Sequence, residues 1–62
     1  MIHSSSVISE NAKISEKVNI GPFCYVGPNV ELSDGVELIS NVHIEGTTKI
    51  EKNTKIFPFA SI

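Results

Sequence analysis

The stretch Ile20-Gly-Pro-Phe-Cys-Tyr-Val26-Gly-Pro-Asn-Val-Glu-Leu32 places an aliphatic residue at every sixth position. Extended in both directions, the same spacing meets only Ile, Leu or Val at eleven consecutive positions, although these types supply 17 of the 62 residues. These aliphatic positions are Ile2, Ile8, Ile14, Ile20, Val26, Leu32, Leu38, Ile44, Ile50, Ile56 and Ile62. A repeat this regular is a property of the fold and takes precedence over any single residue.

A second column of small or β-branched residues follows the first by four positions. It consists of Ser6, Ala12, Val18, Cys24, Val30, Val36, Val42, Thr48, Thr54 and Ala60. A period of six excludes both an amphipathic helix and a coiled coil, whose periods are 3.6 and 3.5. β-Branched residues favour strands, and residues an even number apart share one side of a strand. The repeat therefore predicts short strands with both columns on the inner side.

The chain must turn between one hexad and the next, and a third column supplies the turn residues. Three places after the aliphatic positions stand Asn11, Asn29, Gly35, Asn41 and Asn53. Asn and Gly tolerate a left-handed backbone conformation, which suits a corner. Corners every six residues predict an all-β fold, a parallel β-helix. Known hexapeptide proteins close a triangular coil with 18 residues, whereas period six alone leaves a four-sided coil open.

Stacking of 18-residue coils would align residues 18 apart into three aliphatic ladders along the axis. The 62 residues make about three and a half coils. Ile62 is an inward position with no polar cap after it, and a solenoid needs such a cap. We therefore expect residues 1–62 to be the N-terminal part of a single, longer β-helix domain.

Composition narrows the class of protein. A net charge of −2 and the absence of a basic run argue against a nucleic-acid partner. The segment most similar to a basic run contains Lys49, Lys52 and Lys55. It is interleaved with Glu51, and we expect it to face solvent. Neither a signal peptide nor a membrane span is recognisable. The single cysteine, Cys24, lies in the small-residue column, so we expect it to pack in a protein of the reducing cytoplasm.

Candidate site residues are few. His3 and His43 are predicted to be exposed or corner residues. Neither has a companion carboxylate or second histidine at a spacing from which the sequence alone could identify a catalytic or metal-binding partner. A zinc site built from three histidines would need more histidines than the two in this chain, so a neighbouring subunit would have to contribute. We therefore predict no catalytic, cofactor-binding or metal-binding residue. Several aromatic residues surround the proline corners, together with Ile39, and they favour a subunit interface over a ligand stack. These are Phe23, Tyr25, Phe57 and Phe59.

Four segments resemble the opening of the acyl-[acyl-carrier-protein]–UDP-N-acetylglucosamine O-acyltransferases of lipid A biosynthesis. They are Ile2-His-Ser-Ser-Ser-Val7, Val18-Asn-Ile-Gly-Pro-Phe-Cys-Tyr-Val-Gly-Pro-Asn-Val30, Leu38-Ile-Ser-Asn-Val-His-Ile-Glu-Gly-Thr-Thr-Lys-Ile50 and Ile56-Phe-Pro-Phe-Ala-Ser-Ile62. The departures fall outside the inward columns. Ser15, Ser33 and Glu51 replace a frequent glycine, and Ile39 and Asn41 stand where lysine and histidine are common.

The resemblance implies a left-handed β-helix, although parallel crossovers are usually right-handed. It implies transfer of a hydroxyacyl chain from acyl carrier protein to the sugar 3-hydroxyl, by a cytoplasmic homotrimer without a cofactor. The family's catalytic histidine lies further along the β-helix, so this segment alone is expected to be inactive. Two alternatives remain open: a structural or assembly module, and another hexapeptide enzyme, such as an acetyltransferase or a carbonic anhydrase.

Overall fold

A computed structural model describes all residues, 1–62, and contains nine short strands and no helix. The strands are β1 (Val7–Ile8), β2 (Lys13–Ile14), β3 (Asn19–Ile20), β4 (Tyr25–Val26), β5 (Val30–Leu32), β6 (Glu37–Leu38), β7 (His43–Ile44), β8 (Thr48–Ile50) and β9 (Lys55–Ile56). They form three parallel sheets in the orders β1-β4-β7, β2-β5-β8 and β3-β6-β9. Each sheet therefore takes one strand from each successive coil.

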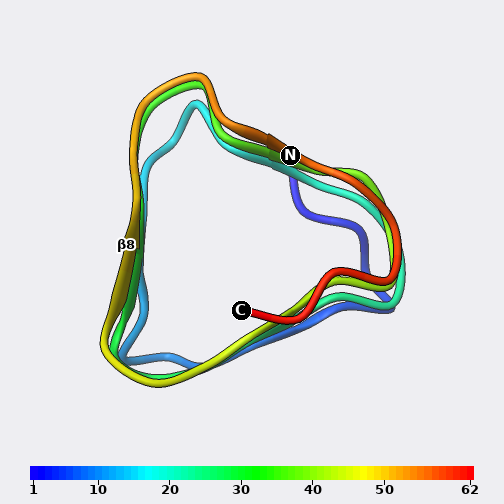
Figure 1. The fold of residues 1–62 in the computed structure, drawn as a ribbon, viewed down its shortest axis with the longest axis horizontal. Coiled ribbons are helices and arrows are strands. Elements are labelled where there is room, and N and C mark those ends of the chain that lie inside the picture. Colours follow the sequence, from blue (N-terminus) through cyan, green and yellow to red (C-terminus); the bar gives the residue numbers. More distant parts are fainter.

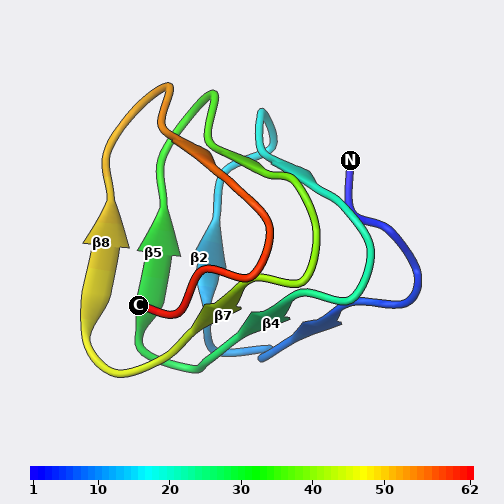
Figure 2. The same ribbon diagram turned by 45° about the vertical axis from the view of Figure 1, so that its right-hand side comes forward.

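The pairing register confirms the triangular coil of 18 residues. Ile8 pairs with Val26 and Val26 with Ile44, and the other two sheets keep the same offset. Figure 1 shows the three sides of the triangle, and Figure 2 shows the coils stacked along the axis. In Figure 1 the chain runs clockwise as it passes from the blue N-terminal coil to the nearer red end. This is the sense of a left-handed parallel β-helix.

The core is a column of aliphatic side chains along the axis, as the repeat predicts. Both inward columns contribute, and Val26, Val36 and Ile44 have no solvent exposure. Ile8 and Ile14 are half-buried in the first coil, while Ile2 and Ile62 are 46% and 47% exposed. These two lie in the outermost layers, where stacking covers only one side. Full burial of such a side chain contributes about 1.5–3 kcal/mol.

The corners agree with the prediction in position and differ in backbone conformation. Gly35, Asn41 and Asn53 have positive φ, as their residue types indicate, and turns also form at Asn11 and Asn29 without it. Phe23 and Phe59 have φ of 59° and 65°. Phenylalanine is not a residue that favours this region, where an L-residue loses roughly 1–2 kcal/mol. Both residues occupy the same corner as Asn41, and the Phe59 amide donates to the Asn41 carbonyl of the neighbouring coil (3.0 Å).

The coils approach each other so closely at Gly21 that no side chain fits there. The Gly21 amide donates to the Leu38 carbonyl (2.8 Å), and its carbonyl accepts from the Ser6 hydroxyl (2.6 Å). A Cβ at this position would lie 2.8 Å from the Ile39 carbonyl carbon and closer still to its oxygen. Glycine is therefore required by the neighbouring coil, since the Gly21 φ lies outside the left-handed region.

Candidate functional site

The outward residues give the three sheets different chemical characters. Sheet β2-β5-β8 aligns Lys13, Glu31 and Lys49 across the strands, which produces a ladder of alternating charge. On sheet β3-β6-β9, Glu37 pairs with Lys55, and their charged groups are 3.9 Å apart. Both side chains of this pair are about half exposed, so the interaction is worth little in water.

Sheet β1-β4-β7 carries a small aromatic cluster instead of a charge ladder. The Tyr25 and His43 rings stack with centroids 4.8 Å apart and planes inclined by 24°. They meet because the two residues are register partners on β4 and β7. The spacing of 18 residues in the sequence is the signal from which this stack could have been predicted.

His43 also has a carboxylate partner, which the spacing in the sequence did not by itself indicate. The His43 Nε2 and Glu45 Oε1 atoms are 3.1 Å apart. The two residues alternate with inward Ile44, so both side chains point outward and meet beside the strand. The side chains are 50% and 64% exposed. The pair thus lies on an open surface, as the prediction of an exposed His43 requires.

His3 lies in the first coil, and the hydrogen bonds of its imidazole stay within its own turn. Its Nδ1 atom accepts from the Ser5 amide (3.1 Å) and lies 2.8 Å from the Ser5 hydroxyl. No carboxylate forms an ion pair with this exposed imidazole. The two histidines are on different coils and share no contact. Their arrangement therefore provides no second base for a reaction at either site.

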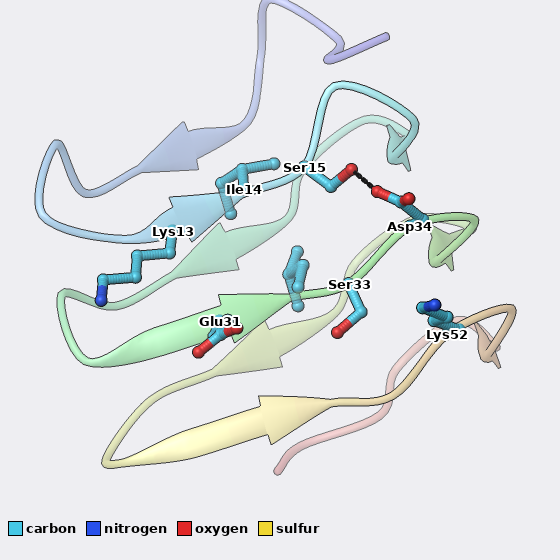
Figure 3. A pocket seen from close by; sticks show the side chains of 8 residues that line it. Lys13, Ile14, Ser15, Glu31, Ser33, Asp34 and Lys52 are labelled. Carbon is cyan, nitrogen blue, oxygen red and sulfur yellow. Dashed lines mark hydrogen bonds between the residues drawn. The ribbon is translucent and has the colours of Figure 1, made fainter.

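The largest hollow, an open cavity of about 420 Å³, lies over sheet β2-β5-β8 and the corner that follows it. In Figure 3, Lys13 and Lys52 lie at opposite ends of it, with Glu31 between them. Ser15 donates a hydrogen bond to Asp34, which occupies one carboxylate oxygen. The lining mixes two cations with two anions, and neither histidine takes part. This arrangement lacks the single sign of charge that would select an ionic ligand.

Acyl transfer to a hydroxyl group requires two kinds of functional group. That reaction needs a base within hydrogen-bond reach of the acceptor hydroxyl, and donors directed at the developing oxyanion. The His43–Glu45 pair resembles an oriented base, but no cavity adjoins it. No group of three or more His, Cys, Asp or Glu side chains is arranged to hold a metal ion. No helix is long and apolar enough to cross a bilayer.

The remaining sequence candidates are placed as follows. Phe23, Phe57 and Phe59 are exposed near the proline corners, whereas Tyr25 and Ile39 are half-buried. Cys24 is a free thiol, 3% exposed, in the core. The positive φ of Phe23 and Phe59 was not predicted from the sequence. Their alignment with Asn41 at 18-residue spacing was the available signal.

Comparison with known proteins shows which proteins this chain is similar to. No family model and no curated protein matches the chain. Among solved structures, the crystal structure of a UDP-N-acetylglucosamine acyltransferase matches with a TM-score of 0.97 and 46% sequence identity. The match covers 98% of this chain and 24% of that chain, so these residues span about a quarter of its length. The resemblance to the UDP-N-acetylglucosamine acyltransferases, and the left-handed parallel β-helix that it implies, are thus confirmed over nearly all of this chain.

Proposed function

We propose that this chain is the N-terminal β-helix segment of an O-acyltransferase of lipid A biosynthesis. The enzyme would transfer a hydroxyacyl chain from acyl carrier protein to the 3-hydroxyl of UDP-N-acetylglucosamine. One observation carries the proposal: 46% identity and a TM-score of 0.97 over 98% of the chain. A shared repeat alone would not carry it, because hexapeptide coils occur in enzymes with many substrates.

Within that enzyme, the segment provides the first coils of the stack and no catalytic residue. The buried ladders give each following coil a preformed edge of parallel strands, on which it adds its own backbone hydrogen bonds. The base and the oxyanion donors would come from residues outside these 62. This division of roles agrees with the separation of His43 from every cavity.

We further propose that the enzyme is a cytoplasmic homotrimer that uses no cofactor and binds neither nucleic acid nor membrane. The reduced, buried Cys24 supports a reducing compartment, and the net charge of −2 offers no attraction to polyanions. Exposed phenylalanines on one corner support self-association. Sedimentation velocity at micromolar concentration tests the trimer, and a folded monomer would contradict it.

A transferase assay tests the activity. The intact enzyme, incubated with hydroxyacyl–acyl carrier protein and UDP-N-acetylglucosamine, should form the 3-O-acyl product. Residues 1–62 alone should give none above background. Failure of the intact enzyme to acylate this sugar would refute the assigned substrate. Turnover by residues 1–62 that disappears in His43→Ala would instead place the catalytic base in this segment.

A further inference from the structure

Sheet β1-β4-β7 carries an imidazole and a carboxylate that no lysine accompanies. Its three strands contain no Lys or Arg, and all five lysines of the chain belong to the other two sheets or to the corner between them. The Glu45 carboxylate pairs with the His43 imidazole, whereas the other ion pair of the chain joins Glu37 to Lys55. No ammonium group therefore competes with the imidazole for Glu45.

The separation of the two polar atoms suits two ligands of one metal ion. Zinc binds imidazole nitrogen at about 2.0–2.1 Å and carboxylate oxygen at about 2.0–2.2 Å. Two such ligands at an angle of about 90–110° are roughly 2.8–3.5 Å apart. The 3.1 Å between His43 Nε2 and Glu45 Oε1 falls within this range. The same distance suits a hydrogen bond from Nε2, so an ion that binds here takes the place of that proton.

The surrounding structure holds both side chains in position without an ion. The Tyr25 ring, on the neighbouring strand β4 (Figure 2), stacks on the His43 imidazole with centroids 4.8 Å apart. The His43 amide donates to the Ala60 carbonyl (3.0 Å), and the Glu45 amide donates to the Ile62 carbonyl (3.2 Å). Binding thus requires little ordering of the backbone, which lowers its entropic cost.

We propose that His43 and Glu45 form a surface chelate site for a divalent transition-metal ion, a property beyond the proposed acyltransferase function. Imidazole nitrogen suits zinc, copper and nickel, whereas magnesium and calcium prefer oxygen ligands. Both side chains are exposed, so water completes the coordination shell. Such an open site agrees with the absence of any group of three or more ligating side chains. It differs from the expectation, drawn from the sequence, of no metal-binding residue.

Two protein ligands set a modest affinity. Structural zinc sites use four ligands and have apparent dissociation constants well below micromolar. Half of their binding free energy corresponds to a dissociation constant of roughly 1–200 µM. His3 provides an internal comparison, because its exposed imidazole interacts with Ser5 and has no carboxylate partner.

The test follows both imidazoles of the intact protein in one experiment. Diethyl pyrocarbonate acylates an imidazole nitrogen that is free of metal, and mass spectrometry of peptides reads His3 and His43 separately. With the affinity given above, Zn²⁺ at about 1 mM should slow modification of His43 at least about fivefold. Modification of His3 should change less than about twofold, and Mg²⁺ should protect neither residue. Equilibrium dialysis should show that His43→Ala binds one fewer Zn²⁺ ion per chain.

Glu45→Gln is the decisive variant, because it keeps the size of the side chain and removes the charge of the ligating oxygen. Protection of His43 by Zn²⁺ should fall below about twofold. Glu37→Gln, which removes an exposed carboxylate on another sheet, is the matched control and should retain full protection. Equal protection of His3 and His43, or undiminished protection in Glu45→Gln, would overturn the chelate. None of these measurements depends on the acceptor sugar, so the proposed function is tested separately.

Discussion

Glycine can be required because no space exists for a side chain or because the backbone has positive φ. Alanine substitutions at Gly21, Gly27 and Gly46 distinguish these two causes. At Gly21, a Cβ would lie 2.8 Å from the Ile39 carbonyl carbon, below the 3.0 Å that real contacts respect, and nearer still to the oxygen. The obstacle is backbone, so the two coils must separate. Separation by about 1 Å would stretch the 2.8 Å bond from the Gly21 amide to Leu38 beyond hydrogen-bonding distance.

The loss of one or two such bonds, with their groups left unpaired, costs about 1–3 kcal/mol each. We therefore expect Gly21→Ala to lower the free energy of unfolding by about 1–6 kcal/mol, a large share of the 5–15 kcal/mol typical of a domain when both bonds are lost. Gly27→Ala is the matched control, since its Cβ would be 3.3 Å from the nearest Glu45 atoms. Its effect should stay within about 1 kcal/mol.

Gly46 provides the complementary case, because a Cβ there meets nothing within 4 Å while φ is 81°. Gly46→Ala should cost only the left-handed strain, about 1–2 kcal/mol. Urea unfolding of the intact protein, followed by far-ultraviolet circular dichroism, measures all three values. The order Gly21, Gly46, Gly27 from most to least damaging is expected. Equal stabilities of the Gly21→Ala and Gly27→Ala proteins would refute the close approach between coils.

Further predictions concern the core and the exposed imidazole. Val26→Asp and Ile44→Asp should each abolish folding, because both sites have no solvent exposure and offer a carboxylate no partner; a native-like circular dichroism spectrum for either would contradict the packing. The Cys24 thiol, 3% exposed, should react with a chromogenic disulfide reagent only after denaturant is added, and a rapid reaction in buffer would show that the core opens. His43→Ala should leave transferase activity of the intact enzyme within about twofold, because the ring stacks on Tyr25 and pairs with Glu45 on an open face; a loss of 100-fold or more would make His43 part of the catalytic site.

The sequence predicts most of this fold because the repeat specifies it many times over. Every aliphatic position repeats the same six-residue spacing. A local exception outside the inward columns, such as Ser15 in place of glycine, therefore changes nothing in the core. Corner conformation is less predictable. Asn29 turns without positive φ, as Asn11 does at the same corner, whereas Phe59 has positive φ, as Asn41 does at its corner. The conformation of these four residues follows their corner and not their residue type.

The candidate site shows a different limit of prediction. The Tyr25–His43 stack follows from the 18-residue register, and the His43–Glu45 pair follows from strand alternation, so both could be predicted once the coil was known. Whether a cavity adjoins them depends on how turns and side chains outside the repeat fill the surface. The six-residue period carries no information about that space.

The constant register has a consequence for how the chain folds. Strand pairs throughout the molecule join residues 18 apart, so each added coil closes a loop of the same length as the one before. The entropy lost per closure therefore stays constant as the chain grows, since that loss depends on loop length. Mean contact separation relative to chain length falls with every coil, which counters the slow folding usual for parallel sheets. Coils can join a preformed edge one after another, in the order in which a ribosome releases them.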